Sequence, residues 1–93
     1  MNPLEKEKML LLIGERIRRM RLLRDKTTKD IAAYLNITTQ AYGKIERGKS
    51  DICLSRLIEL AKYFEEPLVK ILSEDYSAII RFEPFEIFST SKG

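Results

Sequence analysis

The residues best suited to chemistry form a short polar series in the middle of the chain. At offsets of three, four and seven residues, the spacing of one helix face, the sequence carries Gln40, Gly43, Lys44 and Arg47, with Thr39 at the tip of the same helix. The side chains of Thr, Gln, Lys and Arg donate or accept hydrogen bonds, and no acidic residue interrupts the face. The series therefore predicts a slim polar surface for recognition through hydrogen bonds.

Catalytic and metal chemistry have few suitable residues. The 93 residues include no histidine and one cysteine, Cys53, so neither a His-based triad nor a zinc site can form. The four glycines lack the spacing of a phosphate-binding loop. Adjacent carboxylates at 65–66 and 74–75 are expected to be solvated at helix ends rather than to form a catalytic pair. We therefore expect no enzyme activity, no metal and no cofactor.

Length and composition indicate a small cytoplasmic protein. A chain of 93 residues buries a modest core, so dimerisation would add stability. The longest apolar run, 9–13, has five residues and is too short to span a bilayer, and the N-terminus lacks the features of a secretory signal. A single cysteine cannot form an intrachain disulfide, which fits a reducing compartment. Cys53 is expected to be a small buried hydrophobe.

Charge is unevenly distributed along the chain. Residues 14–50 contain ten Lys or Arg against four Asp or Glu, a net charge of +6, whereas residues 51–93 contain five against eight, a net charge of −3. Solvated helix faces explain most charge runs. A basic first half joined to an acidic second half is also typical of a protein that binds a polyanion on one side.

Five helices are expected to position the polar surface. Capping residues and apolar periodicity place them at residues 3–24, 28–35, 39–47, 54–64 and 67–73. Asn2 and Glu5 can form a capping box at the first helix, and Asn36 tolerates the left-handed turn between the second and third. Tyr42 and Ile45 are expected to face inward from the third helix. The sequence thus predicts an all-α domain over 1–76.

The first helix is long and carries more apolar residues than one stripe needs. Its expected core stripe is Ile13, Ile17, Met20 and then Leu23 or Arg24. The apolar residues 9–12 suggest an additional contact, for example with another subunit. The arginines around the other faces are expected to point to solvent; these are Arg16, Arg18 and Arg19.

The last part of the chain, 77–93, has a different pattern. Residues 77–90 alternate apolar and polar types with β-branched and aromatic residues, which predicts a short β-strand, and Pro84 restricts it to a sheet edge or a bulge. A strand with an open edge can pair with its twin in a homodimer or with another protein. Both alternatives remain open for this segment.

Four short motifs carry a family resemblance. They are Ile17-x-x-Met20-Arg21, Thr27-x-x-x-Ile31-Ala32, the run Tyr42-Gly43-Lys44-Ile45-Glu46-Arg47-Gly48-Lys49, and Leu57-x-x-Leu60-Ala61. Together they make residues 13–72 resemble the lambda-repressor-like helix-turn-helix family, which includes phage repressor, Cro and XRE proteins. The resemblance implies a compact five-helix fold that binds double-stranded DNA, usually as a homodimer on two half-sites.

The resemblance also implies roles for single residues. The helix 39–47 matches the recognition helix, and the expected base-contacting positions are Thr39, Gln40, Gly43 and Lys44. The expected phosphate-contacting positions are Thr28, Thr38, Arg47 and Lys49. Arg21 and Glu46 match a family pair that ties the first helix to the third through a partly buried salt bridge. Asp25 and Glu65 stand where the family often has Gly, so both turns are expected to be strained.

The leading interpretation is a sequence-specific transcriptional regulator that acts as a repressor and reads the major groove. A second interpretation is an antitoxin-like protein, whose tail binds a partner toxin while the same helix regulates their operon. A third is a scaffold that has lost DNA binding and makes only protein contacts, which the acid-free face of the third helix disfavours.

Overall fold

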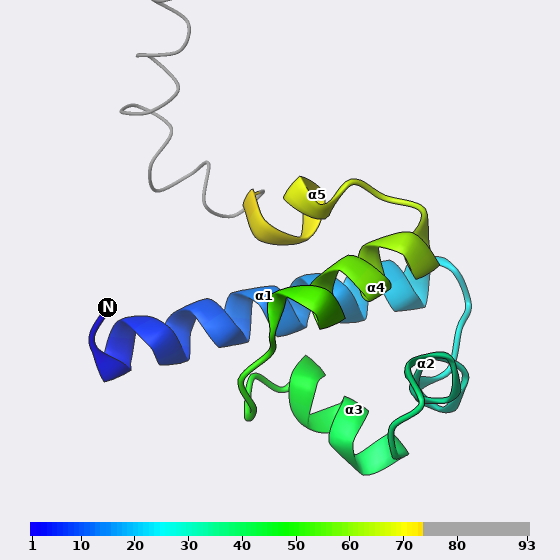
Figure 1. Cartoon of the computed structure of the whole chain (residues 1–93), viewed down its shortest axis with the longest axis horizontal. Coiled ribbons are helices and arrows are strands. Elements are labelled where there is room, and N and C mark those ends of the chain that lie inside the picture. The colour runs from blue at the N-terminus through cyan, green and yellow to red at the C-terminus, as the bar shows by residue number, and fades with distance from the viewer. Residues whose placement is uncertain (74–93) are drawn as a thin grey trace, which may run out of the picture.

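The computed structural model describes residues 1–73, which form five helices and no strand. The helices are α1 (Pro3–Leu23), α2 (Thr28–Leu35), α3 (Thr39–Glu46), α4 (Leu54–Phe64) and α5 (Leu68–Ser73). In Figure 1, α2 and α3 lie below the long α1, whereas α5 lies above it. The expected all-α fold is confirmed, and every helix boundary falls within one residue of its predicted place. The predicted strand at 77–90 lies outside the described residues.

Three helices begin with a side-chain cap. Asn2 and Glu5 exchange two hydrogen bonds of 2.9 and 2.8 Å at the start of α1, and Thr27 and Asp30 exchange bonds of 2.9 and 3.0 Å at the start of α2. The hydroxyl of Thr38 accepts a bond of 3.0 Å from an α3 amide. These local interactions satisfy amides that have no partner within the helix, which explains why the sequence located the helix starts well.

Four helices end in the same backbone reversal. Just beyond α1 to α4, one residue adopts positive φ: Asp25 (55°), Asn36 (61°), Gly48 (69°) and Glu65 (57°). At the end of α2, for example, Asn36 N–H donates to the Ala33 carbonyl at 3.1 Å and Ile37 N–H donates to the Ala32 carbonyl at 3.0 Å. This pair of bonds is the Schellman motif, in which glycine is favoured at the position that adopts positive φ. Asp25 and Glu65 therefore hold a left-handed conformation that disfavours a Cβ, as expected from the sequence.

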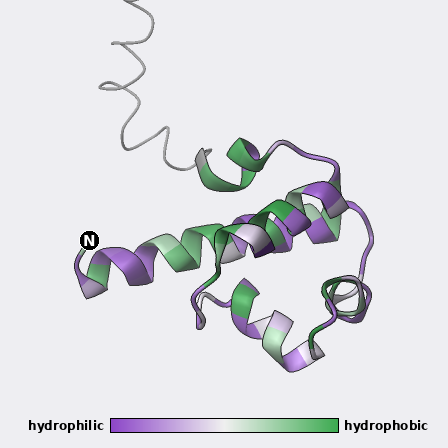
Figure 2. Ribbon diagram, viewed as in Figure 1, coloured by the Kyte–Doolittle hydropathy of each residue, from purple (hydrophilic) through white to green (hydrophobic). Residues whose placement is uncertain are grey.

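The core is built from buried residues of all five helices. Figure 2 shows hydrophobic segments on α1, α4 and α5 among them. Its largest fully buried side chains are Tyr42 and Phe64. The α1 stripe of Ile13, Ile17 and Met20 continues to Arg24, since Leu23 is 81% exposed. The Arg24 guanidinium lies 5.3 Å from the ring centre of Phe64, which is a cation–π contact. It also donates a hydrogen bond of 3.1 Å to the Phe64 carbonyl, so Arg24 covers this edge of the core.

Two expectations about single side chains were wrong. Cys53 is exposed, because it precedes the first turn of α4 instead of lying on the buried face of that helix. A hydrogen bond with Ser55 lowers the pKa of its thiol. Arg16 is buried, with 5% exposure, because α1 contacts α3 as well as α4 and α5 and so buries more than one stripe. Arg18 and Arg19 are exposed, as predicted.

Within residues 1–73 no helix combines the length and the hydropathy needed to cross a membrane.

Candidate nucleic-acid interface

The α2–turn–α3 unit is held at a fixed angle by a buried seam. Ile31 and Ala32 of α2 pack against Tyr42 and Ile45 of α3, and all four are buried. The left-handed Asn36 makes the sharp turn between the two helices. Because apolar contacts and turn geometry act together, the outward face of α3 has a defined orientation with respect to α2.

Two glycines bring α1 against the end of α3. A Cβ at Gly14 would lie 2.6 Å from the carbonyl oxygen of Ile45, and a Cβ at Gly48 would lie 2.9 Å from Cα of Leu11. Both clashes are with backbone atoms, so neither position has room for a larger residue. Sequence reasoning identified Gly48 as a helix stop but missed Gly14, whose only signal was a glycine next to the apolar stripe of a helix. The two close approaches fix the end of α3 on α1.

Arg21, Glu46 and Tyr42 form a partly buried network behind α3. Glu46 accepts hydrogen bonds from Arg21 Nε at 2.6 Å and from Arg21 Nη2 at 3.1 Å, which is the two-point geometry of an Arg–carboxylate pair. The hydroxyl of Tyr42 donates to the same carboxylate at 2.5 Å. The hydrogen bond to Glu46 raises the pKa of Arg21, and burial together with Glu46 raises the pKa of Tyr42 above its ordinary value. Sequence reasoning identified the Arg21–Glu46 pair and missed the hydroxyl of Tyr42.

The outer surface of α3 is polar and open to solvent. Thr39, Gln40, Lys44 and Arg47 are exposed, and Gly43 between them is half-buried. Tyr42 and Ile45 occupy the opposite side of the helix, in the core. The structure thus brings all five residues predicted on this helix onto one face. We call this surface, made of Thr39, Gln40, Gly43, Lys44 and Arg47, the α3 ridge.

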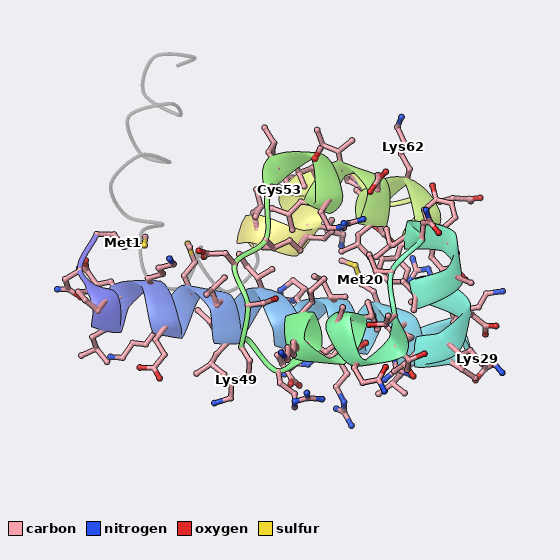
Figure 3. The ribbon with its side chains drawn as sticks, turned by 60° about the horizontal axis from the view of Figure 1, so that its bottom comes forward. Met1, Met20, Lys29, Lys49, Cys53 and Lys62 are labelled. Carbon is pink, nitrogen blue, oxygen red and sulfur yellow. The ribbon has the colours of Figure 1, made fainter. Side chains whose placement is uncertain are left out.

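The other predicted site residues flank the α3 ridge. Thr28 is half-buried in the first turn of α2, and Thr38 caps α3. Lys49 follows the Gly48 turn and is exposed. In Figure 3, α3 lies between the labelled side chains of Lys29 and Lys49, both of which end on the same side of the molecule. Lys29 was not singled out from the sequence, although it follows Thr28 directly.

The acidic residues around the α3 ridge are held away from it. Glu46 binds Arg21, and Asp51 pairs with Lys6 at 2.8 Å. Asp30 accepts the backbone N–H of Thr27, which lowers the pKa of its carboxyl.

The cations near the α3 ridge behave differently. Lys44, Arg47 and Lys49 form no salt bridge with any of residues 1–73, so their charges are directed to solvent. The face is therefore positive and suited to an anionic partner.

Residues 1–73 show little that suits a small ligand. They contain no group of three or more His, Cys, Asp or Glu residues that could hold a metal ion. One open groove lies beside α3, lined by Ile37, Ala41, Ile45, Ser50, Asp51, Ile52, Cys53 and Arg56. Its walls combine four apolar side chains with four polar ones.

Comparison with known proteins agrees with this geometry. A family model described as Helix-turn-helix, of the Cro and C1 repressor type, matches residues 17–71, which is more than half of the chain. The match runs from the middle of α1 to α5 and includes the whole α2–turn–α3 unit. No match was found among curated proteins or among solved structures. The chain therefore belongs to the lambda-repressor-like helix-turn-helix family and is a DNA-binding helix-turn-helix regulator.

Proposed function

We propose that this protein is a sequence-specific repressor that inserts α3 into the major groove of duplex DNA. The observation that carries the proposal is the α3 ridge, which is polar, free of acids, exposed and held from behind by the Arg21–Glu46–Tyr42 network. A single helix of this width fits the major groove of B-DNA. Occupation of promoter DNA is the simplest mechanism of repression, because it needs no additional domain.

Base reading is assigned to the first two turns of α3. The amide of Gln40 can pair with N6 and N7 of adenine, and Lys44 can donate to O6 and N7 of guanine. Thr39 can place its methyl group against the methyl group of thymine. Gly43, the fourth position assigned to base contact, has no side chain and so leaves space on the α3 ridge at that point.

Phosphate contacts are assigned to the residues around α3. Thr28 lies in the first turn of α2, where backbone amides and the positive end of the helix dipole favour a phosphate. Thr38, Lys49 and Arg47 were predicted from the sequence to make the same type of contact. Such contacts set the position of the protein on the duplex, whereas base contacts determine which sequence is bound.

The assembly proposed on DNA is a homodimer. Two copies related by a twofold axis would place their α3 helices on half-sites about 34–36 Å apart, one turn of the duplex. Each added phosphate contact makes binding more sensitive to salt, so a dimer should show a steep salt dependence.

The test combines selection of bound DNA from a random duplex library with one substitution. Gln40→Ala should lower specific affinity by about 1–3 kcal/mol and relax the preference at one base pair of the selected site. Lys62→Ala is the matched control, because Lys62 is an exposed residue of α4 on the side opposite α3 in Figure 3. This control should leave the selected sequence unchanged.

Two results would contradict the proposal. If Gln40→Ala weakened binding to all sequences equally, Gln40 would not read a base. If the wild-type protein bound no duplex DNA at low ionic strength, the DNA-reading function itself would be wrong.

A further inference from the structure

Arg47 does not extend away from α3 but folds back over Gly43. If residue 43 carried a Cβ, that atom would lie 2.9 Å from Nη1 of Arg47, 3.7 Å from Cζ and 3.8 Å from Nη2. The flat guanidinium group therefore covers the bare backbone of Gly43. Because a Cβ at 2.9 Å is too close, this arrangement requires glycine at position 43.

Helix geometry places this guanidinium on the centre line of the α3 ridge. Gln40 and Arg47 are seven residues apart, almost two full turns, so they project along the same line of the helix. This line lies opposite the buried Tyr42 and Ile45. Long helical side chains lean toward the N-terminus, so Arg47 reaches the turn of Gly43, nearer to the end of α3 that enters the groove.

Gly43 has no other evident role in the fold. Glycine is a poor helix former, and its presence in the middle of an eight-residue helix needs a reason. The three nearest atoms that a Cβ would meet all belong to Arg47, and all lie at the far end of a flexible side chain. At Gly14 and Gly48, in contrast, the nearest atoms belong to the backbone of another segment. The feature that Gly43 makes possible is thus the placement of Arg47.

The guanidinium of Arg47 is free to bind a partner. Within residues 1–73 it makes no hydrogen bond and no ion pair, although Glu46 is its neighbour in sequence. Glu46 is occupied by Arg21 and Tyr42 on the inner side of α3. The five N–H donors of Arg47 are therefore available, in the planar arrangement that matches two adjacent acceptors.

We propose that Arg47 is a base-reading residue, which pairs with O6 and N7 of a guanine, and that Gly43 is the residue that positions it. The inference rests on the proposed DNA-reading function and replaces the phosphate contact predicted for Arg47. The major-groove edge of guanine presents two adjacent acceptors, O6 and N7. This edge suits the flat guanidinium group better than the edge of any other base does. A guanine and a phosphate can both bind arginine, so the experiment must separate them.

Arg47→Lys and Gly43→Ala provide the test, read out by the base preferences of the selected site and by the salt dependence of affinity. Arg47→Lys keeps the charge and loses the two-point geometry. It should lower the preference for guanine at one base pair by about tenfold and leave the salt slope unchanged. Gly43→Ala should displace the Arg47 guanidinium and lower the preference for guanine at the same base pair. The melting temperature of this variant should equal or exceed that of the wild type, because Ala is a better helix former than Gly.

Lys49→Ala supplies the pattern expected of a phosphate contact. It should weaken binding to all sequences alike and reduce the salt slope by about one. If Arg47→Ala gave this same pattern, Arg47 would contact a phosphate and the inference would be overturned. A normal guanine preference in Gly43→Ala would overturn the positioning role of Gly43.

Failure of the underlying function would look different. A wild-type protein that binds no duplex DNA overturns the proposed function together with this inference. A wild-type protein that selects a site, combined with an unchanged guanine preference in Arg47→Ala, overturns the inference alone.

Discussion

Glu46 connects two side chains that sequence reasoning treated separately. Its carboxylate accepts from Arg21 of α1 and from the Tyr42 hydroxyl of α3 itself, and its side chain is 7% exposed. Hydrogen bonds to a charged group are stronger than those between neutral groups, especially away from water. The end of α3 nearest Arg47 is thereby attached to α1 by polar contacts in addition to the glycine packing.

Tyr42→Phe tests the hydroxyl contact. At neutral pH the substitution should lower the free energy of unfolding by about 1.5–3 kcal/mol, the range for a hydrogen bond to a charged group. The pKa of Tyr42 in the folded state is raised above its ordinary value of 10.0 by burial and by Glu46. Its contribution to stability is therefore fully present below about pH 10 and is lost as the pH rises above that value.

Urea unfolding of both proteins between pH 7 and pH 11 provides the measurement. The stability difference between wild type and Tyr42→Phe should be constant up to about pH 10 and then shrink by about 1.4 kcal/mol per pH unit. Tyr34→Phe is the matched control, because the Tyr34 ring is half exposed and its substitution should change stability by less than about 0.5 kcal/mol. A difference that stayed constant up to pH 11 would show that Tyr42 is not held in its neutral form by the fold.

At the scale of elements, the helix ends contain strain that the helix starts do not. Each of α1 to α4 ends in a Schellman motif, and in three of the four the left-handed residue has a side chain. Asn tolerates this conformation well, whereas the side chains of Asp25 and Glu65 form no hydrogen bond with any of residues 1–73 that would offset its cost. Sequence comparison with the family located these two turns correctly. Asp25 and Glu65 adopt positive φ because the chain reverses its direction there within a few residues.

Asp25→Gly and Glu65→Gly should each stabilise the protein, by about 0.5–1 kcal/mol, because glycine adopts positive φ without steric strain. Thermal and urea unfolding of the two variants and of the double variant would measure the gain. The double variant should show coupling between the two turns, because Arg24, the neighbour of Asp25, donates to the Phe64 carbonyl and pairs with Glu66, the two residues that flank Glu65.

Asp25→Ala separates backbone strain from the effect of the side-chain charge. Alanine removes the carboxylate but keeps a Cβ, so this variant should gain little. If it gained as much as Asp25→Gly, the strain explanation would be wrong and the charge of Asp25 would be the cause.

At the scale of the whole molecule, charge is organised by face. The exposed cations of the α3 ridge and the adjoining loop lie on one side, and the acids near them are used in caps and salt bridges. The segment 77–93 lies outside the described residues, and its pattern of aromatic and β-branched residues is the basis for the proposed dimer.

Removal of residues 77–93 tests the role of that segment. The truncated protein should sediment as a monomer at a micromolar concentration at which the full chain sediments as a dimer. It should bind the selected operator more weakly, because two linked half-sites bind more tightly than one. Phe85→Ser in the full chain is the companion variant, since it keeps the length and removes one large apolar side chain. A truncated protein that still sedimented as a dimer would contradict the dimer role. Stoichiometric co-purification of the full chain with another protein would favour the antitoxin-like alternative.

The sequence by itself determined the features that depend on neighbouring residues. The starts of α1, α2 and α3 follow from capping residues three positions away, the turn at Asn36 follows from its tolerance of positive φ, and the α3 ridge follows from helical spacing. All of these are governed by interactions within one or two turns, so a local pattern is sufficient to predict them.

Only the tertiary structure decided the features that depend on distant segments. Arg16 is buried and Gly14 cannot carry a side chain because α1 is packed on more than one side, and the Tyr42 hydroxyl shares its acceptor with an arginine 21 positions away. The placement of Arg47 over Gly43 is a choice among rotamers that spacing allows but does not select. Burial, close backbone approach and rotamer choice are set by the packing of the whole molecule, because each depends on which atoms occupy the space around a residue.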